Sequence, residues 1–361
     1  MQIVVFVLML SVLILVHELG HFLIAKLFKM RVEEFGIGLP PRAKSLFVSR
    51  GTLFSLNWLP LGGFVKLFGE DMDDPVQANS PEAFFNKPIW QRTAVLLAGV
   101  IMNFILGVFA FGIVYTYLGI PTKTDKVFVV EVGKNTPAEA AGITVESEIK
   151  KITYQNKVVP FSGVDGFIKQ VEPYKGKELE LTTISKTGQE KSIRITPRLT
   201  PPAGEGALGV ALSNIEMKMY PIWQRPFRGA VVGMQEAWAW GKEIAVNLGT
   251  VLWGIVTGKG VPKDVSGPIG IYQVSKQVYK IGWVAVLQFM AILSINLAIL
   301  NVMPFPALDG GRIFFLGIEM IIGKKLKNRI EGYVHSVGMV FLIGLMVLIT
   351  VRDVIKLIHP L

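Results

Sequence analysis

A histidine pair interrupts a strongly apolar segment near the start of the chain. Residues 17–21 read His-Glu-Leu-Gly-His, between the apolar runs Ile3–Val16 and Phe22–Ala25. Side chains four residues apart share one face of a helix, so His17 and His21 can both bind one Zn²⁺. Ionisable groups are costly inside an apolar span, and a cluster of them indicates function. The pattern therefore predicts a zinc site in or beside a lipid bilayer.

Glu18 directly follows the first histidine and is rotated away from the face that the two imidazoles share. From there it can act on a zinc-bound water instead of binding the metal, because zinc lowers the pKa of that water to about 7. The motif thus predicts hydrolysis with Glu18 as the catalytic base. The alternatives are a chance match and a satisfied polar patch between helices.

The composition indicates a membrane protein that carries one soluble module. The 361 residues are 51% hydrophobic and 18% charged, and the mean hydropathy is +0.48, which is too apolar for an ordinary soluble enzyme. The net charge of +10 comes without a compact basic-aromatic motif, which favours contact with anionic membrane lipid over binding of nucleic acid. The chain has no cysteine, so no disulfide framework is possible.

Four segments are long and apolar enough to cross a hydrocarbon core of about 30 Å. The first lacks a basic start and a small-residue cleavage site, so we expect it to be retained rather than removed as a signal peptide. The other three are about Thr93–Leu118, Trp283–Met303 and Val334–Val351.

Basic side chains in the short loops predict the orientation of these spans. Those that follow the first span are Lys26, Lys29, Arg31, Arg42, Lys44 and Arg50, and those before the last are Lys324, Lys325, Lys327 and Arg329. Both loops are therefore expected in the cytoplasm, and the insert between spans two and three is expected outside it.

The expected segments are 1–27 (first span), 28–92 (cytoplasmic-side loop and re-entrant hairpin), 93–118 (second span), 122–200 (soluble domain), 201–280 (linker and amphipathic helix), 281–311 (third span), 312–333 (cytoplasmic loop) and 334–353 (fourth span).

A membrane-associated β-hairpin is predicted after the first span. Thr52–Trp58 partly alternates as a strand does, and Leu61–Leu67 follows a Pro-Leu-Gly-Gly turn signal. An open strand edge near the metal could pair with an unwound substrate backbone, because a helical peptide bond is shielded from attack. The residues expected at this edge are Gly62, Gly63, Phe64, Val65 and Lys66. The alternative is a hairpin that only packs on the helices, and the Gly-rich segment Phe35–Pro41 is a candidate gate for water.

The insert between the second and third spans changes character. Val127–Pro197 holds short β-type runs divided by Gly, Pro and charged residues, with short helices expected within Asn135–Ile143 and Gly163–Val171. This predicts a small soluble α+β domain. Beyond a Pro/Gly-rich joint at Pro201–Gly206, Phe227–Val256 has helical periodicity interrupted by polar residues. We expect it to lie on the outer membrane surface rather than to form a fifth span.

A third metal ligand is predicted at the end of the third span. Two prolines, Pro304 and Pro306, should break the helix there. Asp309 follows the break as a hard anionic ligand on the cytoplasmic side, where the histidine pair is also expected; the alternative is a helix-ending turn. Asn301 lies two helical turns before Asp309, where it could hold substrate backbone or a developing oxyanion. Structural roles are expected for Asn296, His335 and His359.

Four motifs together resemble one family along nearly the whole chain. They are His-Glu-Leu-Gly-His at 17–21, Pro-Leu-Gly-Gly-Phe-Val-Lys at 60–66, Val-Ser-Gly-Pro-Ile-Gly-Ile at 265–271, and Asn-Val-Met-Pro-Phe-Pro-Ala-Leu-Asp-Gly-Gly at 301–311. The chain resembles the site-2 protease family of intramembrane zinc metalloproteases, in its bacterial RseP/RasP-like branch. This resemblance implies that His17, His21 and Asp309 bind zinc, that Glu18 is the base, and that Asn301 handles substrate.

The resemblance also implies the identity of the soluble domain and the class of substrate. Residues of about 122–200 would form one PDZ domain facing away from the cytoplasm, and Ser147-Glu148 replaces the usual Gly-Asp pair, which bears on recognition of peptide tails. The domain would act chiefly as a size filter. Expected substrates are pre-trimmed single-span proteins of a bacterial inner membrane, such as anti-sigma factors or signal-peptide remnants. The rival classes are a metal transporter and a catalytically silent PDZ scaffold.

Overall fold

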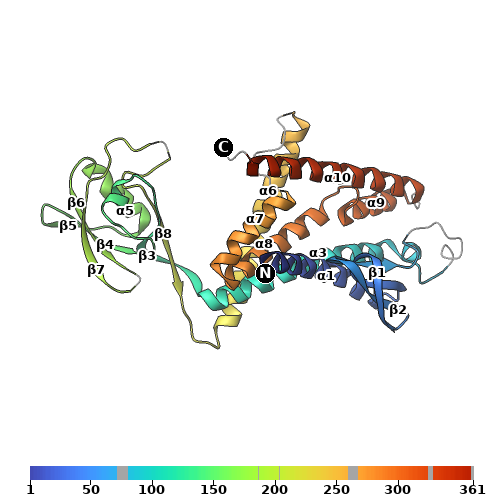
Figure 1. Cartoon of the computed structure of the whole chain (residues 1–361). Helices are drawn as coiled ribbons and strands as arrows, with labels where there is room; N and C mark the ends of the chain where they lie inside the picture. Colours follow the sequence, from blue (N-terminus) through green and yellow to red (C-terminus); the bar gives the residue numbers. More distant parts are fainter. Residues whose placement is uncertain (71–79, 186, 203, 259–266, 324–327, 359–361) are drawn as a thin grey trace. The chain divides into compact units, whose positions relative to one another are not determined.

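The computed structural model describes residues 1–70, 80–185, 187–202, 204–258, 267–323 and 328–358 (Figure 1). The chain divides into two compact units. One comprises Met1–Tyr117 with Pro226–Leu361, and the other is Leu118–Arg225.

The first unit contains the long apolar helices. Within the described residues, the helices long and apolar enough to cross a membrane are α1 (Gln2–Leu27), α3 (Ile89–Leu118), α8 (Trp283–Val302) and the Gly332–Ile355 part of α10 (Asn328–Ile358). They coincide with the four segments that the sequence predicts as spans. The same unit holds η1 (Phe84–Asn86), α6 (Arg225–Val256), α7 (Pro268–Ile281) and α9 (Asp309–Ile322).

Glycines allow the helices of this unit to approach closely. A Cβ on Gly20 of α1 would lie 2.4 Å from the Ala98 carbonyl oxygen of α3. On α6, a Cβ on Gly233 would lie 2.6 Å from the Val108 carbonyl oxygen, and Ala237, one turn later, is fully buried. Small residues permit such backbone contact between apolar helices. The helix predicted over residues 227–256 is confirmed, while its place on the outer membrane surface stays a prediction.

The hairpin consists of β1 (Val32–Ser49) and β2 (Thr52–Leu67), and its turn differs from the prediction. The chain reverses at Arg50 and Gly51, which have φ values of 47° and 76°, as a two-residue hairpin loop requires. The Pro-Leu-Gly-Gly stretch is not a turn but part of β2. Gly62 instead permits close packing on α1, because a Cβ there would lie 2.8 Å from the Ile14 side chain.

Pairing within the hairpin leaves one segment at its edge. Phe35 of β1 is opposite both Phe54 and Val65 of β2, so residues 34–37 have a β2 segment on each side. In the described part of the chain, Gly63–Leu67 has strand partners on its β1 side only. The candidate gate Phe35–Pro41 is itself part of β1.

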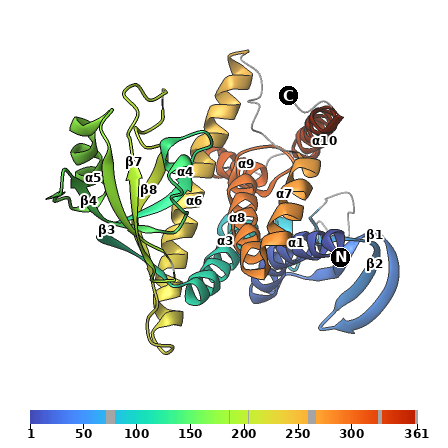
Figure 2. The same ribbon diagram turned by 60° about the vertical axis from the view of Figure 1, so that its left-hand side comes forward.

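The second unit is an antiparallel sheet with short helices (Figure 2). Its elements are β3 (Ile120–Val132), α4 (Pro137–Ala140), β4 (Glu148–Tyr154), β5 (Lys157–Val159), α5 (Gly163–Val171), η2 (Glu172–Tyr174), β6 (Leu179–Ile184), β7 (Glu190–Ile195) and β8 (Val210–Lys218). The strand order is β7-β6-β4-β3-β8, and β5 pairs with β4. Phe167 of α5 packs into a core with Val127, Ile152 and Leu181. The two predicted short helices are thus present as α4 and α5.

Two of the expected boundaries are wrong. The sheet does not end near residue 200, because β8 pairs with β3, with Leu212 opposite Val129. The expected loop 312–333 is helical over its first part, where α9 runs to Ile322. One side of α9 is apolar, and Leu316 packs into a core shared with α1, the hairpin and α3. A buried ion pair of 2.6 Å between Arg92 and Glu319 also joins α9 to α3, and these contacts explain why the segment folds as a helix.

Candidate metal centre

The two histidines of the motif lie one turn apart on α1 and are buried, at 7% and 8% exposure. Their Nε2 atoms are 3.1 Å apart. His21 Nδ1 lies 2.8 Å from the Val95 carbonyl oxygen of α3. A carbonyl only accepts hydrogen bonds, so Nδ1 carries the proton and the neutral ring keeps a lone pair on Nε2. The Nε2 atom of His21, which faces His17, is therefore available to bind a metal ion.

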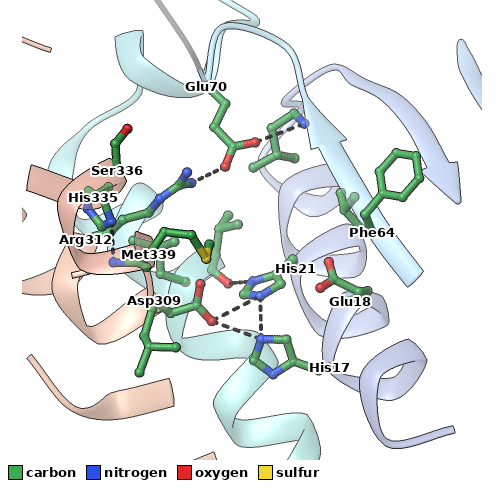
Figure 3. A pocket seen from close by; sticks show the side chains of 16 residues that line it. His17, Glu18, His21, Phe64, Glu70, Asp309, Arg312, His335, Ser336 and Met339 are labelled. Atoms are coloured by element: carbon green, nitrogen blue, oxygen red, sulfur yellow. Dashed lines mark hydrogen bonds and ion pairs between the residues drawn. The ribbon is translucent and has the colours of Figure 1, made fainter. Parts of the chain in front are cut away.

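Asp309 reaches the histidine pair from a distant part of the sequence. Helix α8 ends at Val302, and α9 begins with Asp309. The Asp309 Oδ2 atom lies 3.0 Å from His17 Nε2 and 3.3 Å from His21 Nε2 (Figure 3). The predicted ligand set is thus brought together across 292 residues of sequence.

The donor set and its dimensions fit zinc. Two imidazole nitrogens and one carboxylate oxygen lie within 4.8 Å of one another. Ligands at about 2.0–2.2 Å from a tetrahedral Zn²⁺ are separated by roughly 3.3–3.5 Å, close to the 3.0–3.3 Å observed here. Three protein ligands leave a fourth position open, which is the arrangement of catalytic rather than structural zinc sites.

Gly99 of α3 leaves room for the imidazoles. A Cβ at this position would lie 2.6 Å from His21 Nε2 and 2.7 Å from His17 Cε1. Both distances are shorter than real Cβ contacts, so the rings occupy space that any other residue would fill. The position of the ligands therefore depends on a glycine from a neighbouring helix.

Glu18 and the ligand triangle face one cavity of about 560 Å³. Its walls come from α1, the hairpin, α3, the start of α9 and α10. In Figure 3 the Glu18 carboxylate lies beside His21, on the side of the hairpin residue Phe64. Glu18 is not a member of the candidate ligand set, so its carboxylate is left available to act on a group in the cavity.

The five hairpin residues predicted to bind substrate divide into three groups. Phe64 and Val65 line the cavity. Gly62 and Gly63 pack against α1, where their added Cβ atoms would meet Ile14 and Leu15. The Lys66 ammonium is mostly exposed and lies 2.8 Å from Glu33.

Asn301 lies next to the candidate metal ligands, near the end of α8. Its Nδ2 is 3.4 Å from His17 Nε2. This contact places an amide donor beside one of the three candidate ligands.

Two further features around the site, Asn103 and an ion pair at the cavity wall, were missed in the sequence. Asn103 of α3 is fully buried, 3.2 Å from His17 Nδ1. An ion pair joins Glu70, beyond β2, to Arg312 of α9 at the cavity wall. His335 Nδ1 accepts a hydrogen bond of 2.8 Å from the Ala307 amide, which fits the structural role expected for it. Of these features, only Asn103 carried a signal in the sequence, because it is an amide within an apolar span. His359, for which a structural role was also expected, lies outside the described residues.

Comparison with known proteins gives the family. Residues 5–345 match the model of Peptidase family M50, and the chain belongs to this family. It is 33% identical to a Clostridium acetobutylicum protein whose name assigns it to the zinc metalloproteases, over 98% of this chain and 97% of that protein. It is 28% identical to the zinc metalloprotease RasP of Oceanobacillus iheyensis, over 98% of this chain and 99% of that protein, and 28% identical to RasP of Geobacillus kaustophilus, over 98% of each.

The class of protein follows from the family and from the four apolar helices. The chain is a zinc metalloprotease of the site-2 type, with Zn²⁺ as its cofactor. It is a membrane protein, and it acts on membrane-protein substrates as a protease of this family.

Proposed function

We propose that His17, His21 and Asp309 hold the catalytic zinc and that Glu18 is the general base of an intramembrane endopeptidase. The observation that carries this proposal is the triangle of ligand atoms with sides of 3.0–3.3 Å, facing the same cavity as the Glu18 carboxylate. The triangle has two corners on a helix that is apolar enough to span a membrane. Hydrolysis would therefore take place at the depth of the bilayer.

The roles of the side chains follow from their positions. When bound, zinc polarises a carbonyl and makes water acidic enough to act as a nucleophile near neutral pH. Glu18 takes the proton of the attacking water and returns it to the leaving amide nitrogen. The Asn301 amide donates to the oxyanion that develops on the substrate carbonyl, because its Nδ2 lies 3.4 Å from a metal ligand.

The hairpin edge is the proposed binding site for the substrate backbone. Gly63–Leu67 has an unpaired edge in the described part of the chain, and Phe64 and Val65 line the cavity. An unwound substrate can add to this edge as a further strand, which satisfies its backbone groups and holds its carbonyl near the metal. Specificity would then depend on the side chains that alternate along the added strand.

A cross-linking experiment tests the hairpin role, and the chain suits it because it has no native cysteine. In a Glu18→Gln background, which we expect to keep bound substrate intact, Lys66→Cys is expected to form a disulfide with a cysteine placed near the scissile bond. Ser49→Cys is the control, because Ser49 is exposed beside the turn of the same hairpin. Equal cross-linking at both positions, read from gel shifts, would contradict substrate addition at the edge.

We further propose that the protein lies in a bacterial inner membrane with its metal site near the cytoplasmic side. The basic residues of the loop after the first span support this orientation. The second unit would be a single PDZ domain outside the cytoplasm, as its antiparallel sheet with two short helices suggests. It would act chiefly as a size filter, so that substrates are single-span proteins whose outer portion has been removed, such as anti-sigma factors or signal-peptide remnants.

Purified full-length protein in detergent tests this function. A tagged single-span substrate is offered in a trimmed form and in a form with a folded outer domain, with and without a zinc chelator. We expect the trimmed form to be cut inside its apolar span, cutting to stop after chelation, and cutting to return with added zinc. Mass spectrometry of the products locates the cut. A cut outside the apolar span, or equal cutting of both forms, would overturn the intramembrane or the size-filter proposal respectively.

A further inference from the structure

Asn103 lies in the middle of α3 with its side chain fully buried beside the metal site. Its Nδ2 is 3.2 Å from His17 Nδ1, the ring nitrogen that faces away from Asp309. Its Oδ1 is buried and has no hydrogen-bond partner. Buried polar atoms without partners are rare and each one calls for an explanation.

The tautomer of His17 decides which atom of the Asn103 amide should face the ring. A neutral imidazole that binds metal through Nε2 carries its proton on Nδ1 and donates it to an acceptor. In the assigned orientation the Asn103 amino group faces this N–H, so two donors meet while the Oδ1 acceptor has no donor. Oxygen and nitrogen of a side-chain amide are assigned from their hydrogen bonds. Exchanging them places Oδ1 where it can accept from His17 Nδ1.

We infer that Asn103 is a positioning residue that accepts a hydrogen bond from His17 Nδ1–H and so holds Nε2 as a metal ligand. This inference rests on the proposed role of His17 as a ligand. Helix α3 then orients both histidines, since His21 donates to the Val95 carbonyl two turns earlier on the same helix. The Asn103 carbonyl oxygen, on the backbone of the same residue, accepts a separate hydrogen bond of 2.7 Å from the Ser294 hydroxyl of α8.

Three substitutions separate this role from simple packing. Asn103→Leu has a similar volume and removes the acceptor, so zinc affinity should fall by about 10- to 100-fold. Asn103→Asp has only acceptor oxygens, so it should keep zinc affinity within a few-fold of wild type. Ser294→Ala is the matched control, because it removes a buried hydrogen bond at the same helix crossing without touching His17. Affinity is measured on the full-length protein by competition with a chelator, independently of cleavage.

The outcomes are distinct. Wild-type affinity in Asn103→Leu, or equal loss in Asn103→Asp and Asn103→Leu, would overturn the inference. Should the Leu variant fail to fold, a loss of zinc affinity in Asn103→Asp would overturn it. The unfolding temperature of each zinc-free variant reports the fold. His17→Ala is measured in parallel. If it abolishes tight zinc binding, the proposed ligand set stands, and a negative result for the Asn103 variants contradicts only the inference about Asn103. If zinc binding does not depend on His17, the proposed ligand set fails and the inference fails with it.

Discussion

Glu18→Gln is expected to lower the rate of substrate cleavage by about 10²- to 10⁴-fold, the usual contribution of a general acid–base residue, with zinc still bound. The amide has nearly the shape of the carboxylate but cannot take a proton from water. Glu18 is not a member of the set of ligand atoms, so the metal should remain. Cleavage of a single-span substrate and zinc content by elemental analysis, measured on the same preparation, check the two halves of this prediction.

Asp309→Ala is the partner experiment. It should abolish cleavage as well, but through loss of zinc, because it removes one corner of the triangle with sides of 3.0–3.3 Å. The contrast between the two variants also separates the rival functions. A metal transporter or a PDZ scaffold has no need of a base beside the first ligand, so its activity would survive Glu18→Gln. Full cleavage by that variant would remove the proposed mechanism.

Gly99→Ala is expected to weaken zinc binding by about 10- to 100-fold, although Gly99 binds nothing itself. The new Cβ would lie 2.6 Å from His21 Nε2 and 2.7 Å from His17 Cε1, so the rings or the helix must move. Overpacking of this kind costs about 1–3 kcal/mol, and each 1.4 kcal/mol corresponds to a factor of ten in affinity. Zinc affinity by chelator competition checks the prediction.

Gly112→Ala is the matched control for this change. It places the same methyl group on the same helix, where the nearest atom, Ala230 Cα, is 3.5 Å away in ordinary contact. It should leave zinc affinity unchanged. If both variants bind zinc as the wild type does, the imidazoles are not confined by Gly99.

Much of the site could be predicted because its side chains are close in sequence or follow residues, such as proline, that strongly affect the local backbone. The first span and the His17–His21 face follow from helical periodicity, and the helix break before Asp309 follows from two prolines. The hairpin turn was misplaced because Pro60–Gly63 carries the glycines typical of a turn. Those glycines instead serve a contact with α1, where Ile14 leaves no room for a side chain. Asn103 was missed because an amide in an apolar helix gives no sign of which residue it will face.

The sequence by itself determined the four apolar helices and the shared face of His17 and His21, because length, hydropathy and the pitch of a helix are properties of neighbouring residues. Only the tertiary structure decided that Asp309 lies 3.0 Å from His17 and that Gly99 clears space for both rings. Each of these depends on contacts between segments far apart in the chain. Such contacts are set by how helices and strands pack together, which no local pattern encodes.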